Sequence, residues 1–172
     1  NGQQIARAAD AQALLVVGCG PLGLLHIRLA RAQGITRIAA IDPIAHRREV
    51  AAASGADLVL PPGEETADQL REWSGGGVDV MIVAIGREDA LTPYFSVLAP
   101  GAHISLFAGF PASAMLEVAA NDIHYNEWEF VGASSCRLEG FHAVADLIST
   151  GRLRVADLIG TVFPLERAQD AL

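Results

Sequence analysis

The sequence predicts an α/β fold: a doubly wound, six-stranded parallel sheet in the order 3-2-1-4-5-6, with helices on both faces. Residues 14–17 and 78–85 are nearly continuous apolar runs, which is typical of parallel strands that are buried on both sides. Strand patterns alternate with helical patterns, and this spacing implies right-handed crossovers within one sheet. A ligand is then expected beyond the carboxyl ends of the first and fourth strands, where the strand order reverses.

The individual elements follow from the same periodicity. Six strands are predicted, at residues 14–17, 37–41, 57–60, 78–85, 102–107 and 130–133. Helices are predicted at residues 3–11, 22–33, 45–54, 64–73, 87–98 and 140–150. Within the fifth of these helices, Pro93 moves the firm start close to Thr92. Residues 100–101, Pro-Gly, predict a turn, and residues 115–118 are a candidate for a short extra strand.

A glycine-rich turn after the first strand is the central motif of the chain. Gly18, Gly20 and Gly23 have GxGxxG spacing between a strand and a helix, the arrangement that binds a dinucleotide pyrophosphate. The first glycine permits the tight turn, the second lets the backbone approach the phosphates, and the third lets the helix lie close to the strand. The helix N-terminus then faces the pyrophosphate. Glycine spacing alone is weak, because methyltransferases and ordinary turns contain similar patterns.

The second strand supplies the missing context. It ends at Asp42, 19 positions after Gly23, where an acidic residue can accept hydrogen bonds from the adenosine ribose. A 2′-phosphate would meet the negative charge of this carboxylate, so Asp42 favours NAD over NADP. The alternative is that Asp42 caps the helix that begins after Pro43. Both roles are compatible, and the paired signals favour a Rossmann-type dinucleotide site.

Composition narrows the functional class further. The 172 residues suffice for one domain with a sizeable core, and the hydrophobic fraction is 51%. The net charge of −8 disfavours a nucleic acid or an anionic membrane as partner. The sequence has neither an apolar run long enough to span a membrane nor a signal-peptide pattern. Cys19 and Cys136 are far apart and form no disulfide framework, which favours a reduced, cytoplasmic protein.

The motifs, taken in order, resemble the coenzyme domain of medium-chain, zinc-dependent alcohol and polyol dehydrogenases, near the sorbitol and threonine dehydrogenase branch. The resemblance covers nearly the whole chain. The matching features are residues 16–24 (VVGCGPLGL), Asp42 with Arg47, residues 53–57 (ASGAD), 77–86 (GVDVMIVAIG), 98–109 (LAPGAHISLFAG), 122–132 (DIHYNEWEFVG) and 163–172 (FPLERAQDAL).

The resemblance implies a set of cofactor contacts. Leu22 would offer its backbone N–H to the pyrophosphate, and Arg47 would lie beside the adenine or ribose, unless it is simply a solvated helix residue. The loop after the fourth strand would pass near the cofactor, and those after the fifth and sixth would enclose the nicotinamide. These loop residues are Ala84, Ile85 and Gly86, then Leu106, Phe107 and Ala108, and finally Ala133, Ser134 and Ser135. Some polyol dehydrogenases carry an arginine where Ser135 stands.

The same resemblance implies an NAD-dependent oxidoreductase acting on an alcohol or polyol by hydride transfer. The catalytic zinc of this family is held by a separate N-terminal barrel domain, so we expect no catalytic or metal-binding residue in this chain, and little turnover from it alone. The five histidines are dispersed and lack ligand spacing. Asp57 and Asp79 stand at strand starts and are interpreted as structural. The alternatives are a non-catalytic NAD(H)-sensing module and, less favoured, a methyltransferase.

The resemblance also predicts the organisation of the chain, which begins with Asn1 and ends in a helical pattern. We expect residues 1–13 to be a linker or helix from the N-terminal domain, residues 14–154 the NAD-binding domain, and residues 155–172 a segment that returns to the catalytic domain. The two ends should therefore be the least regular and least protected parts. Related dehydrogenases pair through edge strands, so a homodimer or tetramer is expected to form near residues 115–118.

Overall fold

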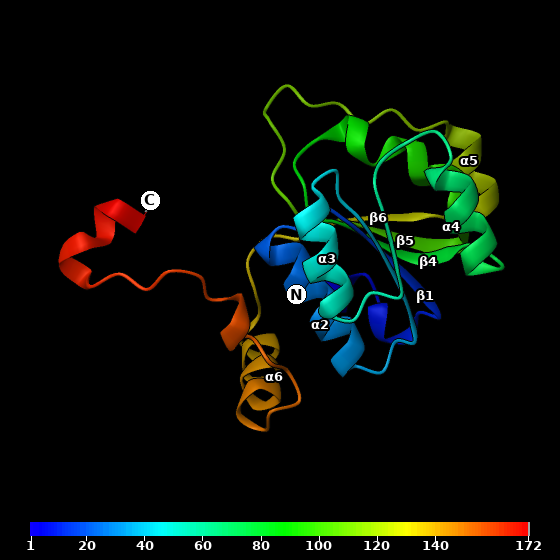
Figure 1. Cartoon of the computed structure of the whole chain (residues 1–172). Coiled ribbons are helices and arrows are strands. Elements are labelled where there is room, and N and C mark those ends of the chain that lie inside the picture. Colours follow the sequence, from blue (N-terminus) through cyan, green and yellow to red (C-terminus); the bar gives the residue numbers. More distant parts are fainter. Residues whose placement is uncertain (172) are drawn as a thin grey trace.

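The computed structural model describes residues 1–171, and its centre is a six-stranded sheet (Figure 1). The strands are β1 (Ala13–Val17), β2 (Arg37–Ile41), β3 (Leu58–Leu60), β4 (Val78–Val83), β5 (Leu98–Leu106) and β6 (Glu129–Gly132). Neighbouring strands pair in parallel throughout, in the order β3-β2-β1-β4-β5-β6. The predicted fold class and strand order are confirmed.

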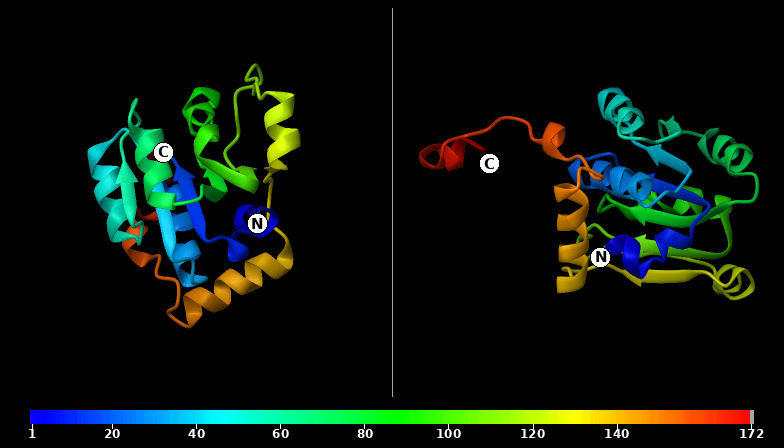
Figure 2. Two further views of the ribbon diagram at one scale, coloured as in Figure 1. Left: turned by 90° about the vertical axis from the view of Figure 1, so that its right-hand side faces the viewer. Right: turned by 90° about the horizontal axis from the view of Figure 1, so that it is seen from below.

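Helices cover both faces of the sheet (Figure 2). The α-helices are α1 (Gly2–Ile5), α2 (Pro21–Ala32), α3 (Ala45–Ala53), α4 (Thr66–Ser74), α5 (Ala120–Asn126) and α6 (Leu138–Ser149). Short 3-10 helices are η1 (Ala8–Asp10), η2 (Glu88–Ala90), η3 (Thr92–Val97), η4 (Ala156–Leu158) and η5 (Leu165–Ala171). Side chains of η1, α2 and α3 join one buried cluster, and those of α4 and η3 join the other.

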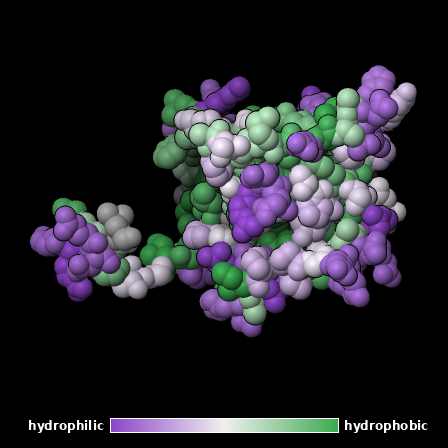
Figure 3. All heavy atoms as spheres, turned by 90° about the horizontal axis from the view of Figure 1, so that it is seen from above, coloured by the Kyte–Doolittle hydropathy of each residue, from purple (hydrophilic) through white to green (hydrophobic). Residues whose placement is uncertain are grey.

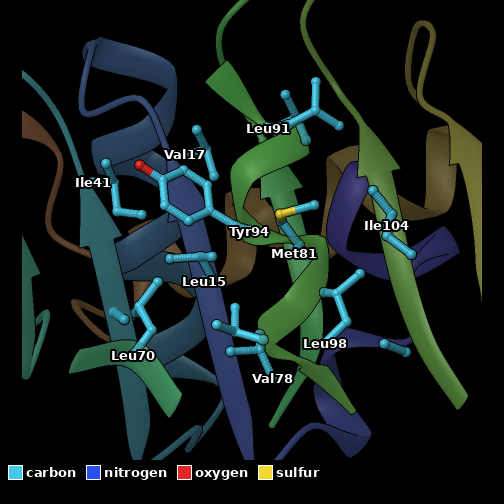
Figure 4. Close-up of a cluster of buried hydrophobic side chains, with 14 of the residues drawn as sticks. Leu15, Val17, Ile41, Leu70, Val78, Met81, Leu91, Tyr94, Leu98 and Ile104 are labelled. Carbon is cyan, nitrogen blue, oxygen red and sulfur yellow. The ribbon is translucent and has the colours of Figure 1, made fainter. Parts of the chain in front are cut away.

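The alternation of side chains along each strand divides the core between these faces. On β1, Leu14 and Val16 belong to the cluster under α2, whereas Leu15 and Val17 belong to the cluster under α4 and η3. Figure 4 shows the second cluster, in which Tyr94 lies across the strands beside Leu15 and Val17. All of β1 is buried, which explains its unbroken apolar sequence.

The carboxyl ends of five strands lie in register along one edge of the sheet. Val17 of β1 aligns with Ile41 of β2 and with Val83 of β4. Val83 aligns in turn with Leu106 of β5, which aligns with Gly132 of β6. The segments that follow these strands therefore start side by side. Every loop in which the sequence predicts cofactor contacts begins at this carboxyl edge.

The structure differs from the prediction in the form of two elements and in one additional helix. The fifth strand begins at Leu98 and not at residue 102. The predicted Pro-Gly turn at 100–101 lies inside this strand, where the pairing of β4 with β5 shifts its register. The predicted helix at 87–98 is two 3-10 helices, the second with Pro93 in its first turn. Helix α5 was not predicted, because its seven residues are too short for a clear period.

The extra strand predicted at residues 115–118 is wrong. This segment is irregular and pairs with no strand among residues 1–171. Leu116 and Val118 pack against the core, whereas Met115 is 75% exposed. The alternating pattern that suggested a strand thus reflects side chains that point alternately inward and outward from an extended but unpaired segment.

The two ends of the chain behave differently. The expectation of poor protection is wrong for the opening, because Gln3, Ala6 and Ala8 are buried. After Leu158, by contrast, the chain leaves the body of the molecule, as Figures 1 and 3 show. Val162 and Leu165 in this segment are exposed. Among residues 1–171, no helix combines the length and apolar character needed to cross a membrane.

Candidate cofactor-binding site

The turn between β1 and α2 is shaped by the close approach of its glycines. Gly18 has a φ of 97°, in the left-handed region, and a Cβ there would lie 3.2 Å from that of Ile85. A Cβ on Gly23 would lie 1.9 Å from the Gly18 carbonyl oxygen, so α2 approaches β1 only because Gly23 has no side chain. Around Gly20 no described atom lies within 4 Å of the Cβ position. The backbone at Gly20 is therefore open to approach from outside the turn.

The N-terminus of α2 borders the same turn. Leu22 lies in the first turn of the helix, where backbone N–H groups have no partner within the helix, and its side chain is 53% exposed. No acidic side chain occupies this first turn. The partial positive charge of the helix end is therefore not neutralised by its own residues, which suits the binding of an anion.

A cavity of about 410 Å³ lies between the glycine turn and the loops that follow β2, β3 and β4. Its apolar wall includes Val17, Ile85 and Tyr94, and two carboxylates, Glu64 and Asp89, also line it. A hydrogen bond from Arg87 keeps the pKa of the Asp89 carboxyl below its usual value, so this side chain is ionised at neutral pH. An apolar wall with two carboxylates beside it favours a flat, uncharged group in the cavity over an anion.

Asp42 joins the glycine turn to the segment that leads into α3. The residue is 2% exposed, and its Oδ2 accepts a hydrogen bond of 2.9 Å from the Cys19 N–H. Its Oδ1 accepts a hydrogen bond of 2.8 Å from the Ile44 N–H, which forms an Asx turn. The N-cap of α3 is Ile44, so Asp42 does not cap this helix. Arg47 Nη1 lies 3.8 Å from Oδ2. Each oxygen retains acceptor capacity for a further hydroxyl group.

Burial and charge also affect the neighbouring thiol. Cys19 is fully buried, and burial together with the Asp42 carboxylate raises the pKa of this thiol to about 12. The side chain between the first two glycines is therefore a neutral packing group at physiological pH.

The loops after β4 and β5 touch at the next part of the edge. The Ala84 N–H donates a hydrogen bond of 2.9 Å to the Val17 carbonyl, which holds Ile85 over the glycine turn. A Cβ on Gly86 would lie 2.1 Å from the Gly109 carbonyl oxygen. The sequence prediction placed Gly86 beside the cofactor, and the structure gives it a second role as the point where these two loops cross.

The far part of the edge is formed by the ends of β5 and β6. The N–H groups of Phe107 and Ala108 both donate to the Val83 carbonyl, at 3.2 and 3.0 Å. The Ala133 N–H donates to the Leu106 carbonyl at 3.1 Å. Four of the predicted contacts, Leu106, Phe107, Ala108 and Ala133, are thus brought together.

Ser134 and Ser135 lie at the exposed end of this group. Their carbonyl oxygens accept hydrogen bonds of 3.2 and 2.8 Å from the Asn1 side chain, which ties the opening segment to the loop after β6. Ser135 has a φ of 60°, an uncommon backbone conformation for a residue other than glycine. Both serines therefore help to fix the opening segment of the chain, a role that the sequence did not indicate.

Two residues of the site were missed by sequence reasoning. Tyr94 is 3% exposed but lines the cavity, and Figure 4 shows its hydroxyl between Ile41 and Val17. His26 is 7% exposed and packs edge-on against Phe107, with 4.3 Å between ring centroids. Burial lowers the pKa of His26 to about 4, so the ring is neutral. No contact of His26 was predicted from the sequence, because its partner Phe107 is 81 residues away.

The strand order and the glycine turn at the carboxyl edge therefore define this chain as a Rossmann-type α/β domain. Its sequence matches the zinc-binding dehydrogenase family over residues 21–150. The chain belongs to the zinc-binding dehydrogenase family, which confirms the predicted resemblance. Among residues 1–171, no group of three or more His, Cys, Asp or Glu side chains could hold a metal ion. The described residues therefore do not form a zinc site.

Several relatives and solved structures are similar to the chain. It is 31% identical to L-threonine 3-dehydrogenase of Pyrococcus horikoshii over 160 residues, covering 90% of this chain and 45% of the relative. It is 32% identical to D-guloside 3-dehydrogenase of Escherichia coli K12 over 138 residues, covering 79% and 39%. A short chain alcohol dehydrogenase of E. coli CFT073, complexed with NADH, is 25% identical with a TM-score of 0.87, covering 99% and 50%. The chain spans about half the length of the relatives it matches.

Proposed function

We propose that this chain binds NAD(H) along the carboxyl edge of its sheet, as the cofactor-binding part of a zinc-type dehydrogenase that oxidises an alcohol or polyol. The observation that carries the proposal is the pairing of open space at Gly20 with the buried carboxylate of Asp42 on the adjacent strand. Family membership and the NADH complex of the similar E. coli enzyme support it. When bound, NAD supplies the hydride acceptor for alcohol oxidation.

In this proposal each part of the edge takes one part of the cofactor. The N-terminus of α2 and the backbone at Gly20 hold the pyrophosphate. Asp42 accepts hydrogen bonds from the adenosine ribose, and the cavity beside Ile85 and Tyr94 takes the adenine ring. The nicotinamide lies along the paired ends of β5 and β6, where the backbone of Phe107 and its neighbours is already fixed by hydrogen bonds.

The charges around the cavity favour NAD over NADP. A phosphate on the 2′-hydroxyl would meet the negative charge of Asp42, and Glu64 adds a second carboxylate in the neighbouring cavity, whereas Asp89 is already paired with Arg87. Arg48 donates to the Asp42 carbonyl at 2.9 Å, and the Arg47 guanidinium is 3.8 Å from the carboxylate on a side chain that is 49% exposed. Solvent screens such an exposed charge strongly, so we expect the carboxylates to decide the preference.

Calorimetric titration with NADH and with NADPH tests both parts of the proposal. We expect NADH to bind more tightly than NADPH. Asp42→Asn should weaken the binding of NADH by about 1–3 kcal/mol and reduce the difference in affinity between NADH and NADPH. Arg47→Gln serves as the matched control and should change NADH affinity by less than about 1 kcal/mol. Equal binding of both cofactors by the unchanged chain would contradict the assigned preference, and no binding of either would contradict the proposed function.

The same proposal extends to the whole protein. The substrate is an alcohol or polyol, and any catalytic zinc is held outside residues 1–172, in the length of the relatives that this chain does not span. Nucleic acid and membranes are not partners in this proposal. Cys19 and Cys136 are both free thiols, which supports a cytoplasmic setting.

We also propose that the protein forms a homodimer or tetramer through residues 115–118. This segment has a 75% exposed methionine, Met115, and β6 leaves the adjacent end of the sheet unpaired within the described chain. Analytical ultracentrifugation should detect a dimer that Met115→Glu weakens. Val162→Glu, at an 81% exposed position in the terminal segment, is the control. A monomer at all concentrations would refute the assembly without affecting cofactor binding.

A further inference from the structure

A second cavity, of about 810 Å³, lies away from the carboxyl edge, between α2, the end of α3 and the segment that follows α6. This segment runs beside α2 (Figure 2). Four arginines line the cavity, Arg28, Arg31, Arg152 and Arg154. They are a third of the 12 basic residues in a chain whose net charge is −8, so the local charge is opposite to that of the whole protein.

Two of these arginines are held by partners within the fold. Arg28 donates to Ser54 Oγ at 3.0 Å and forms a two-pronged ion pair with Asp157, and its side chain is only 12% exposed. Arg31 donates to the Gly55 carbonyl and pairs with Asp57 at 2.7 Å. Both are fixed, and the two nearby carboxylates are already matched by them.

The other two arginines, Arg152 and Arg154, are exposed and make few hydrogen bonds within the described chain. Arg152 makes one long contact of 3.5 Å, to the Ala32 carbonyl at the end of α2. The Arg154 guanidinium makes no hydrogen bond or ion pair within residues 1–171. Apolar surface from Ala53, Ile148 and Val155 lies in the same cavity. Two exposed guanidinium groups thus stand beside an apolar wall, and the nearby carboxylate, Asp157, is already paired with Arg28.

We propose that this cavity binds a small organic phosphate, with the phosphate group held by Arg152 and Arg154 and the organic part against the apolar wall. Guanidinium groups match phosphate oxygens in a planar, two-pronged geometry, and two cations match the charge of a phosphate monoester. The volume lies in the range of small-molecule sites. The site is separate from the proposed NAD(H) site, since the two cavities share no lining residue.

Titration with phenyl phosphate, followed by calorimetry and by amide chemical shifts, tests the proposal. We expect saturable binding that shifts the amides of residues 151–157. Arg152→Gln and Arg154→Gln should each weaken it about tenfold, the loss expected for a charge-assisted hydrogen bond. Arg7→Gln makes the same charge change at an exposed position outside the cavity and should leave the affinity unchanged. Because Arg154 has no side-chain partner in the described chain, its substitution should not disturb folding.

Three results would overturn the proposal: no saturable binding, unchanged binding in both cavity variants, or displacement of phenyl phosphate by NADH. Inorganic phosphate should bind more weakly than phenyl phosphate, and equal affinity would refute the role of the apolar wall. Both cavity variants should bind NADH as the unchanged chain does. A failure of NADH binding alone would therefore count against the proposed function and leave the organic phosphate site standing.

Discussion

Two substitutions within the same turn should separate cofactor binding from folding. Gly20 has a φ of −68°, which any residue adopts, and nothing lies within 4 Å of its Cβ position. Gly20→Ala should therefore fold normally, because the gain of about 0.4–1 kcal/mol from a less flexible unfolded chain offsets the poorer N-cap that alanine makes for α2. The added methyl group would occupy the space assigned to the pyrophosphate. Losing about two backbone hydrogen bonds to a charged group would cost about 3 kcal/mol, or roughly 100-fold in affinity.

Gly23→Ala should give the opposite result. Its Cβ would lie 1.9 Å from the Gly18 carbonyl oxygen, a backbone atom that cannot rotate away, so α2 or β1 must shift. We expect a loss of about 1–3 kcal/mol in unfolding free energy, as for other overpacked sites. Denaturant unfolding and NADH calorimetry on both variants provide the measurements. If Gly20→Ala bound NADH normally, or if Gly23→Ala kept full stability, our interpretation of the turn would be wrong.

Two further predictions follow from the buried titratable groups. Burial lowers the pKa of His26 from 6.5 to about 4, so the unfolded chain takes up a proton at a higher pH than the folded chain does. The contribution of this histidine to the free energy of unfolding is therefore constant above pH 6.5 and falls by about 3 kcal/mol as the pH drops towards 4. His26→Gln should flatten this dependence of the unfolding free energy, whereas the exposed-site control His46→Gln should retain it. In the native chain, iodoacetamide should modify the exposed Cys136 but not Cys19, whose pKa is raised to about 12. Mass spectrometry would refute this if Cys19 were labelled before unfolding.

Local sequence signals were sufficient for the centre of the fold. The β1–turn–α2–β2 unit was predicted to within one or two residues, because each strand is a short apolar run and glycines mark the turns. The positions of Asp57 and Asp79 at strand starts likewise indicated their structural roles. Asp79 accepts hydrogen bonds from the Gln12 and Ala13 N–H groups, and Asp57 from the Ile38 N–H.

The features that sequence could not give are long-range. Burial of the opening segment depends on contacts such as the hydrogen bond from Gln3 to the His26 carbonyl, and no local pattern encodes it. Tyr94 reaches the cavity because η3 packs on the face of the sheet that carries Leu15 and Val17 of β1, whereas in the sequence it is one apolar residue of a helical pattern. The error at residues 115–118 has the same origin, since alternation records which side chains are buried and not whether the backbone is paired.

Asp42 shows how one side chain can serve both the fold and the ligand. Two backbone N–H groups hold its carboxylate before any ligand arrives, so a ribose meets an acceptor that has already lost its rotamer freedom. Arg47, half exposed and 3.8 Å away, must still be ordered to make a contact, at a cost of up to about 2 kcal/mol in side-chain entropy. The preference for NAD over NADP should therefore depend mainly on the Asp42 carboxylate. Alanine would leave both the Cys19 and the Ile44 N–H without an acceptor, whereas asparagine keeps one acceptor oxygen for one of them, so asparagine removes the charge with the smaller disturbance of the turn.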